Sequence, residues 1–226
     1  MKEHSKRYKE AVKQVDPTKV YTLKEAVSCL KKMAATKFDS SVDLHFQLGV
    51  DTKKPEEMVR GTVVLPHGRG KSIRVAVFCK GEAEKEAKEA GADIVGGEDL
   101  INKVAGGFMD FDSAVATPDI MKELSKLGKV LGPRGLMPSP KTGTLTNDVG
   151  KAVRELKKGK VEYKVDKQGG IHISIGKLSF DETKIYENAA RVIEAINSAR
   201  PGTLKGTYIR NLSLASSMSP GFKIVF

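Results

Sequence analysis

The sequence predicts a protein of the α/β and α+β classes with two domains: both chain ends build one α+β domain, and the middle of the chain forms an inserted α/β domain. Three observations predict this organisation. The middle of the chain alternates short apolar runs with charged amphipathic segments, the pattern of a parallel sheet connected by helices. The flanking parts alternate strictly between apolar and polar residues, which is typical of half-buried antiparallel strands. The length of 226 residues is long for one core and sufficient for two.

The N-terminal part is predicted to contain two helices and two strands. The second helix has the clearest start, because Thr22 and Glu25 have the spacing of a capping box and apolar residues then recur at helical intervals. In the strand that follows, apolar and polar residues alternate, so we expect one buried face and one polar face. In chain order we expect helices over residues 2–14, ended by Asp16-Pro17, and 22–34, then strands over residues 42–50 and 60–65.

The middle part is predicted to alternate strands with helices. Its first strand, Ile73 to Phe78, is a compact apolar run of the kind found inside a sheet. The expected elements are strands over residues 73–78, 93–95 and 113–116, helices over residues 82–90, 98–104 and 118–126, a loop over residues 131–143 and a helix over residues 147–158.

The C-terminal part returns to the alternating pattern. Two strands, residues 161–165 and 171–175, flank the turn-forming sequence Asp166-Lys167-Gln168-Gly169-Gly170, and we expect them to pair as a hairpin. The remaining expected elements are a helix over residues 181–198, a strand over 207–214, a loop of small polar residues over 213–221 and a strand over 222–226.

The domain boundaries are expected near His67 and Gly159. Residues 1–67 and 160–226 would form the discontinuous α+β domain, and residues 68–159 a Rossmann-like, three-layer α/β domain. The net charge of +11 is divided unevenly: 23 Lys and Arg stand against 15 Asp and Glu in the discontinuous domain, but only 16 against 13 in the insert. Positive charge attracts polyanions, and nucleic acid is the most common of these. The discontinuous domain is therefore the stronger candidate for nucleic-acid binding.

The composition disfavours several classes of protein. No apolar stretch approaches the ~18 residues that a membrane span needs, and the charged start leads into no apolar run, so we expect neither a membrane partner nor a secretory signal. Cys29 and Cys79 lack the spacing of a zinc site or a disulfide framework. His45 and His172 are expected to be surface imidazoles. We expect no metal, no cofactor and no catalytic residues, in a reducing cytoplasm.

Two other functions stay open on the sequence alone. An enzyme could bind a small ligand at the carboxyl ends of the inserted parallel strands, although the glycine-rich fingerprints of nucleotide sites are missing there. A general RNA chaperone would need only the positive charge.

Two segments of the discontinuous domain suit nucleic acid by residue type. Lys37-Phe38-Asp39-Ser40-Ser41 brings a cation, a ring and hydroxyls to the start of a strand, where Phe38 could contact a base or sugar, or pack in the core. The small side chains of the Ser213–Gly221 loop would let backbone groups approach RNA closely, and Met218 would be an exposed apolar contact. His172 could meet a phosphate or a 2′-hydroxyl if its hairpin faces RNA.

A third segment leads to a known family. Leu131-Gly132-Pro133-Arg134-Gly135-Leu136-Met137-Pro138 resembles the signature of the large-ribosomal-subunit protein one ("L-one") family, the lateral-stalk ribosomal proteins, and most closely its bacterial form. The resemblance covers essentially the whole chain. It includes Lys6-Arg7-Tyr8, Tyr21-Thr22, Lys37-Phe38-Asp39, Arg60-Gly61-Thr62, Leu65-Pro66-His67-Gly68, Gly91-Ala92-Asp93, Val95-Gly96-Gly97-Glu98, Met109-Asp110-Phe111-Asp112, Val115-Ala116-Thr117-Pro118-Asp119, Ile171-His172 and Lys205-Gly206-Thr207.

The resemblance implies a structural role in the large ribosomal subunit. Such a protein binds a helical junction of 23S ribosomal RNA, forms the mobile lateral stalk near the E site and assists the release of deacylated tRNA there. It can also repress translation of its own operon mRNA through a similar RNA structure. The resemblance further implies a cytoplasmic, ribosome-associated protein that is a monomer when free.

The resemblance also implies which residues bind RNA. The principal contacts would come from the discontinuous domain: Lys37, Phe38, Ser41, Asp166, Lys167, Gly169, His172, Ser216, Ser217, Met218 and Ser219. Auxiliary contacts in the insert would come from Lys129, Arg134 and Lys141. Position 219 is often glycine in the family's motif, so Ser219 departs from the pattern at the closest backbone approach.

Overall fold

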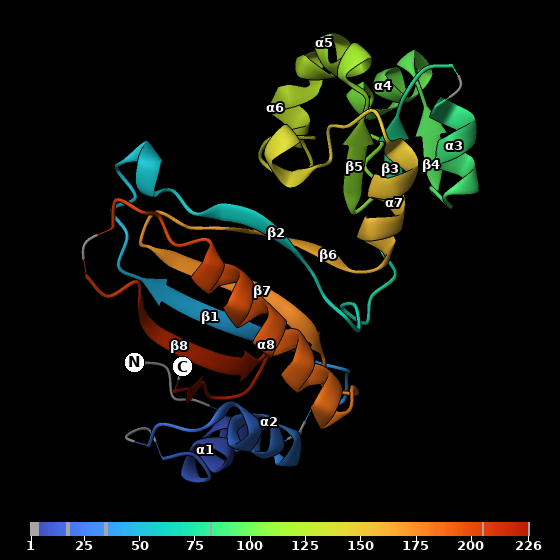
Figure 1. Ribbon diagram of the computed structural model, residues 1–226. Coiled ribbons are helices and arrows are strands. Elements are labelled where there is room, and N and C mark those ends of the chain that lie inside the picture. The colour runs from blue at the N-terminus through green and yellow to red at the C-terminus, as the bar shows by residue number, and fades with distance from the viewer. Residues whose placement is uncertain (1–4, 17–18, 34–35, 82, 205, 226) are drawn as a thin grey trace. The chain divides into compact units, whose positions relative to one another are not determined.

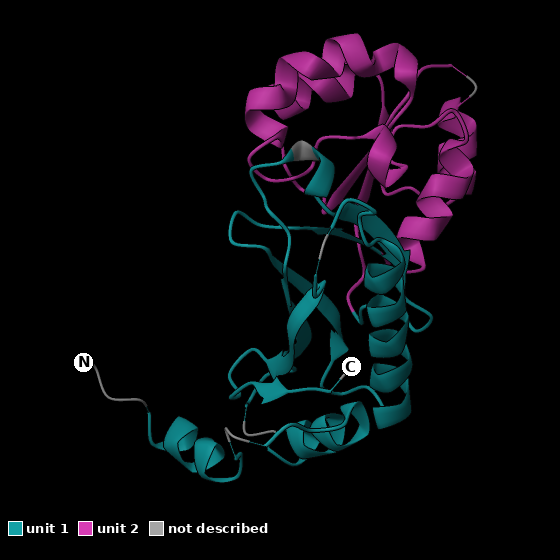
Figure 2. Cartoon of the chain, turned by 60° about the vertical axis from the view of Figure 1, so that its left-hand side comes forward, with its two compact units in different colours: residues 1–70, 161–226 teal, residues 71–160 magenta. Residues whose placement is uncertain are grey.

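The computed structural model describes residues 5–16, 19–33, 36–81, 83–204 and 206–225, which form a mixed α/β protein with three sheets (Figure 1). The predicted positions at residues 2–4, Pro17, Ala34, Glu82 and Phe226 lie outside the described residues. The chain divides into two compact units, residues 1–70 with 161–226 (unit 1) and residues 71–160 (unit 2) (Figure 2). That these units fold and move as separate domains stays a prediction. Within the described part of the chain, no helix is long and apolar enough to span a bilayer.

Unit 1 is organised around a four-stranded antiparallel sheet. The strand order is β7-β1-β8-β9, and β2 and β6 form a separate two-stranded ribbon. The elements are helices α1 (Lys6–Lys13), α2 (Leu23–Lys32) and α8 (Glu182–Ser198), the 3₁₀ turn η1 (Pro55–Glu57), and strands β1 (Ser41–Leu48), β2 (Arg60–Val64), β6 (Lys160–Lys164), β7 (Gly170–Lys177), β8 (Ile209–Ser216) and β9 (Phe222–Lys223).

The core of unit 1 lies between one face of this sheet and α8 (Figure 1). On the central strand β1, Val42, Leu44, Phe46 and Leu48 are all buried, as their alternation predicts. Buried residues of α8 at helical spacing pack into the same cluster: Ile185, Ala189, Val192 and Ile196. The other face of the sheet is left to the polar residues of the same strands.

A local sequence signal sets the start of α2, the helix that packs beside α8. The expected capping box at the start of α2 is present: the Thr22 amide donates to a Glu25 carboxylate oxygen at 2.9 Å, and the Glu25 amide donates to the Thr22 hydroxyl at 3.4 Å. This pair satisfies two of the amides that a helix start leaves without intrahelical partners.

The expected hairpin between residues 161–165 and 171–175 is wrong. After the turn at Asp166, the chain changes partners, since β6 pairs with β2 and β7 pairs with β1. The turn itself forms, because the Asp166 amide donates to the Gly170 carbonyl at 2.8 Å. Ile171 and Ile173 of β7 pair with the buried Phe46 and Leu44 of β1, so packing across the larger sheet decides the pairing.

The C-terminal strand also differs from its prediction. β8 continues to Ser216, so Ser213–Ser216 belong to the sheet and the loop of small residues is shorter than expected. β8 still pairs with β1 at its last residue, because Ser216 lies opposite Val42. The last strand is short, covering Phe222 and Lys223, with an isolated bridge between Tyr21 and Ile224.

Unit 2 holds a three-stranded parallel sheet with a hydrophobic cluster on each face. The strand order is β4-β3-β5, and side chains alternate along β3, with Ala76 and Phe78 in one cluster and Val75 and Val77 in the other. The elements are β3 (Val75–Phe78), α3 (Ala83–Glu89), β4 (Ile94–Gly96), α4 (Glu98–Ala105), β5 (Ser113–Ala116), η2 (Pro118–Ile120), α5 (Met121–Leu124), η3 (Ser125–Leu127), α6 (Gly128–Leu131), η4 (Pro140–Thr142) and α7 (Val149–Lys157).

The single helix expected over residues 118–126 is a series of short turns instead. Elements η2, α5, η3 and α6 follow one another up to Leu131. The Ser125 hydroxyl donates to the Met121 carbonyl at 2.7 Å, a local bond that competes with regular helix geometry. The expected 131–143 loop is likewise interrupted by η4.

Candidate nucleic-acid interface

The sheet of unit 1 presents a polar face on the side away from its core. Residues that pair across antiparallel strands point to the same side, so the register of β1 defines this face. We call it the polar face, and it comprises Asp43 with Ser174 and Ala215, His45 with His172 and Ser213, and Gln47 with Gly170 and Asn211. Nearly all of these side chains are short or polar, so another molecule's backbone could approach closely.

One end of β1 gathers most of the RNA-binding residues expected from the family. The Ser217 amide donates to the Ser41 carbonyl at 3.2 Å, which joins the segment before β1 to the loop after β8. The Lys177 ammonium at the end of β7 donates to the Ser41 hydroxyl at 3.1 Å and to the Asp39 carbonyl at 3.3 Å. We call this set the strand-end cluster: Lys37, Phe38, Ser41, Lys177, and Ser216 to Ser219.

Two large apolar side chains of this cluster are exposed. Phe38 is 51% exposed and Met218 is 52% exposed, so the core-packing alternative for Phe38 is excluded. The backbone beneath Phe38 is held by Thr36, whose hydroxyl donates to the Phe38 carbonyl at 2.8 Å and contacts the hydroxyl of the buried Ser40 at 2.8 Å. A fixed backbone thus presents apolar side chains to solvent beside the exposed Lys37.

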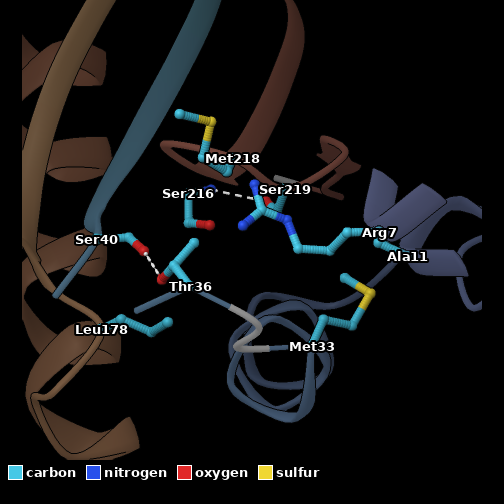
Figure 3. A pocket seen from close by; sticks show the side chains of 9 residues that line it. All are labelled: Arg7, Ala11, Met33, Thr36, Ser40, Leu178, Ser216, Met218 and Ser219. Atoms are coloured by element: carbon cyan, nitrogen blue, oxygen red, sulfur yellow. Dashed lines mark hydrogen bonds between the residues drawn. The ribbon is translucent and has the colours of Figure 1, made fainter. Parts of the chain in front are cut away.

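A small pocket opens beside the strand-end cluster (Figure 3). It is lined by Arg7, Ala11, Met33, Thr36, Ser40, Leu178, Ser216, Met218 and Ser219. The Arg7 side chain extends from α1 toward Ser216 and Ser219 (Figure 3). The Ser219 hydroxyl accepts from the Ser216 amide at 2.8 Å and donates to the Pro220 carbonyl at 2.9 Å. Ser219 therefore ties the loop to itself at the position where the family often has glycine.

The other end of β1 meets the turn between β6 and β7. The Asp166 carboxylate accepts from the Gln168 amide at 2.8 Å and the Gly170 amide at 2.7 Å, and these bonds lower the pKa of Asp166 below its usual value. Gly169 has a φ of 82°, and its carbonyl accepts from the Leu48 amide at 2.8 Å. These bonds dock the turn on the end of β1 and leave Lys167 exposed.

His45 and His172 lie between the two ends, and they are not independent surface imidazoles. Their Nδ1 atoms are 2.9 Å apart, and His172 Nε2 lies 3.6 Å from an Asp166 carboxylate oxygen. Burial, and then the neighbouring His172, lower the pKa of His45, while Asp43 raises it. His45 lies on the polar face as expected, but it is only partly exposed and forms a pair with His172.

The two groups of predicted residues are therefore separated by the length of one strand. The eight residues of β1 span about 23 Å at the usual rise of ~3.3 Å per residue. The strand-end cluster and the Asp166–Gly170 turn border the polar face at its two ends.

The three auxiliary residues belong to unit 2 and are all exposed. Lys129 lies on α6, Arg134 in the loop after it and Lys141 in η4. The loop at Arg134 is anchored by Leu131, which is fully buried and whose carbonyl accepts from the Leu136 amide at 3.0 Å. Gly135, with a φ of 70°, lets the chain turn there.

The carboxyl ends of the parallel strands, where an enzyme of this fold class would bind its ligand, hold ion pairs. The Lys80 ammonium lies 2.6 Å from a Glu98 oxygen and 3.1 Å from a Glu123 oxygen. Burial raises the pKa of the Cys79 thiol to about 11, so it is a poor nucleophile. Among the described residues, no group of three or more His, Cys, Asp or Glu side chains is arranged to hold a metal ion.

Sequence reasoning missed three residues at this interface. In the sequence, Arg7 stands out only through the family resemblance, Lys177 carries no distinguishing pattern, and His45 is predicted only as a surface imidazole. Strand register would have found His45 and Lys177, since they pair with His172 and Ser41, but register joins positions more than 100 residues apart.

Together the fold and the polar face define a basic α/β protein whose antiparallel sheet carries one largely polar face. Comparison with known proteins identifies the family. The model of the "Ribosomal protein L1p/L10e family" matches residues 30–220. The large ribosomal subunit protein uL1 of Solidesulfovibrio magneticus is 54% identical over 224 residues, which are 99% of this chain and 95% of that protein.

The chain belongs to the ribosomal protein L1p/L10e family. The resemblance read from the sequence is thereby confirmed. A protein of this family is structural and not enzymatic, which excludes the enzyme alternative, and it is found in the cytoplasm on the ribosome.

Proposed function

We propose that this chain is a constituent of the large ribosomal subunit that binds 23S ribosomal RNA through unit 1. The observation that carries the proposal is the strand-end cluster, where exposed Phe38 and Met218 stand beside Lys37 and Lys177 on a backbone held by hydrogen bonds. Exposed apolar side chains and cations on a rigid support suit unstacked bases and phosphates. The Asp166–Gly170 turn would contact the same RNA at the far end of β1.

The proposed mechanism is docking, without bond chemistry. The positive charge outside residues 68–159 supplies a salt-dependent attraction to phosphates. The polar face and its two loops supply the fit to an irregular RNA shape, because their hydrogen-bonding groups need matching partners. Lys129, Arg134 and Lys141 of unit 2 would add auxiliary contacts.

Three finer roles belong to the same proposal. The RNA–protein complex would form the mobile lateral stalk near the E site and assist release of deacylated tRNA, with the two chain crossings between the units acting as a hinge. The free chain, a monomer, would also bind its own operon mRNA and repress its translation. Paired-label distances that showed one fixed separation of the units in solution would overturn the hinge, and a leader mRNA that failed to compete with ribosomal RNA would overturn the repressor role.

The central test is RNA binding by Phe38→Ala. Loss of one stacked ring should weaken binding to a stalk-junction fragment of 23S RNA by about 1–3 kcal/mol, or about 5- to 150-fold in Kd. Thermal unfolding should be unchanged, because Phe38 is exposed. Phe108→Ala is the matched control, since Phe108 is a 39% exposed phenylalanine of unit 2.

The test discriminates between specific binding and general charge attraction. The wild-type chain should prefer the stalk fragment to a scrambled duplex of equal length across a salt series, and Phe38→Ala should reduce that preference. An RNA chaperone would bind both RNAs equally, with the same salt slope. Equal affinity for both, or an unchanged Kd for Phe38→Ala, contradicts the proposed interface.

A further inference from the structure

His45 and His172 form a connected pair in the middle of the polar face. The two residues lie opposite each other in the register of β1 and β7, with ring centroids 5.0 Å apart and Nδ1 atoms 2.9 Å apart. At that distance one Nδ1 must carry a proton and the other must accept it. The pair therefore behaves as one hydrogen-bonded unit.

The position of Asp166 determines which histidine donates in the Nδ1–Nδ1 hydrogen bond. Its carboxylate lies 3.6 Å from His172 Nε2, and a carboxylate favours a proton on the nitrogen that faces it. With its proton on Nε2, His172 accepts at Nδ1, so His45 donates from its own Nδ1. This tautomer is assigned from the Nδ1–Nδ1 hydrogen bond together with the position of the Asp166 carboxylate.

The assignment leaves His45 Nε2 as an unprotonated acceptor. Within the described residues this nitrogen has no hydrogen-bond partner, and the side chain is only half-buried. Its neighbours across the sheet, Ser213 on β8 and Ser174 diagonally on β7, are short and partly exposed. A ligand can therefore reach this side of the imidazole without displacing a large side chain.

Among the described residues, Asp43 on β1 acts on His45 and Asp166 lies beside His172. Lys223 on β9 lies opposite Ser213, on the same face of the sheet. In the free protein, burial and the adjacent imidazole hold the pKa of His45 below its ordinary value, against the opposing effect of Asp43. His45 is thus mainly neutral near pH 7, and a bound anion would reverse the balance in favour of the charged form.

We propose that the His45–His172 pair is a phosphate-binding element of the RNA interface, and that His45 takes up one proton at Nε2 when RNA binds. The inference rests on the proposed function and deepens it, by adding a contact between the two ends of the polar face. The proton comes from solvent. His45 then donates from Nε2 to a phosphate oxygen and from Nδ1 to His172, whose Nε2–H faces Asp166.

The thermodynamic linkage between proton uptake and RNA binding gives the sign and size of the pH effect on RNA affinity. Because binding takes up a proton, RNA affinity rises as pH falls, by at most about tenfold per pH unit between the free and bound pKa values. We expect the wild-type Kd for stalk RNA to tighten about 3- to 10-fold from pH 8 to pH 6 at constant salt. Lysine and arginine contacts do not titrate in this range, so they contribute no slope.

Titration calorimetry of the full-length protein with the stalk-junction fragment tests the proposal. Measuring the binding enthalpy at pH 7 in two buffers of different ionisation enthalpy counts the protons taken up by the wild type, without any substitution. His45→Gln should abolish both this uptake and the pH dependence of Kd. His67→Gln is the matched control, because His67 is a partly exposed histidine of unit 1 that pairs with Glu187 on α8, away from this face.

The outcomes separate the two proposals. Proton uptake that is lost in His45→Gln and kept in His67→Gln supports the phosphate-binding pair. Specific binding of stalk RNA by the wild type without proton uptake overturns the pair and leaves the proposed function intact. An unchanged pH dependence in His45→Gln also overturns it. Equal binding of stalk and scrambled RNA overturns the proposed function itself.

Discussion

Replacing Asn188 with alanine should destabilise unit 1 more than any surface substitution on the same helix. Asn188 is fully buried on α8. Its side-chain oxygen accepts from the His67 amide at 3.1 Å, and its nitrogen donates to the carbonyls of Gly68 at 3.0 Å and Ile175 at 2.8 Å. The side chain thus holds both the sheet and the segment in which the chain leaves the first part of unit 1.

The hydrogen bond from Asn188 to the Ile175 carbonyl lies where the pairing of the sheet is irregular. The register between β1 and β7 shifts at Val42 and Asp43, which pair with Gly176 and Ser174, so Ile175 has no partner on β1. A bulge of this kind leaves backbone groups outside the ladder. Asn188 satisfies the Ile175 carbonyl, and alanine would leave it buried and unpaired.

The magnitude follows from the three bonds. One buried carbonyl left without a partner costs about 1–3 kcal/mol, and each of the two part-buried bonds contributes about 0.5–1.5 kcal/mol. Asn188→Ala should therefore lower the free energy of unfolding by about 2–6 kcal/mol, a large share of the ~5–15 kcal/mol that holds a typical domain together. Hydrogen exchange at the His67 amide, which lies in the turn after β2, should accelerate by more than at the buried amides of the sheet.

Urea denaturation followed by circular dichroism measures the loss, since the chain contains no Trp for fluorescence. Asn197→Ala is the control, because Asn197 lies exposed near the end of the same helix and such changes usually stay within about 0.5 kcal/mol. A loss below about 1 kcal/mol for Asn188→Ala, or equal losses for the two variants, would refute the reasoning from buried hydrogen bonds.

Two further predictions concern the Asp166–Gly170 turn. Gly169→Ala should destabilise the protein by about 1–2 kcal/mol, because Gly169 has a φ of 82° and an added Cβ would lie 3.0 Å from the Leu48 carbonyl oxygen. Gly202→Ala is the control, because Gly202 has an ordinary φ and open space around it. It should have little effect in the same urea titration. Asp166→Ala should lower the melting temperature at pH 7. The difference from wild type should shrink as pH falls below about 4. The sign follows from the lowered pKa of Asp166, which makes its contribution present above the unfolded pKa and lost as pH falls through the folded one. A difference between wild type and Asp166→Ala that stayed constant down to pH 2 would contradict this.

The parts of the fold that were predictable are those set by local physics. The capping box at Thr22 and Glu25 and the alternation along β1 needed no knowledge of distant residues, and both appear in the structure. The hairpin prediction failed because strand pairing is not local. β6 joins β2, about 100 residues earlier, since each strand pairs where its apolar residues find a matching face.

The candidate site shows the same division. Residue type alone indicated Phe38 and Met218, but only the folded chain shows that both are exposed at one strand end. The pairing of His45 with His172 depends on a register between strands 127 positions apart along the chain, which no local pattern reveals. Composition predicted a binding protein, and register specified which side chains act together.

The central position of β1 explains why stability and binding can be separated in unit 1. Its even-numbered residues pack against α8, while His45 and its other odd-numbered residues lie on the polar face. Because the side chains of a strand alternate strictly, a substitution at an odd position removes a polar-face group without opening a cavity in the core. Both ends of β1 are tied by backbone hydrogen bonds to the loops beside them, Ser41 to Ser217 and Leu48 to Gly169. The distance between the two loops is therefore set by one rigid strand, and an RNA that contacts both loops must match that length.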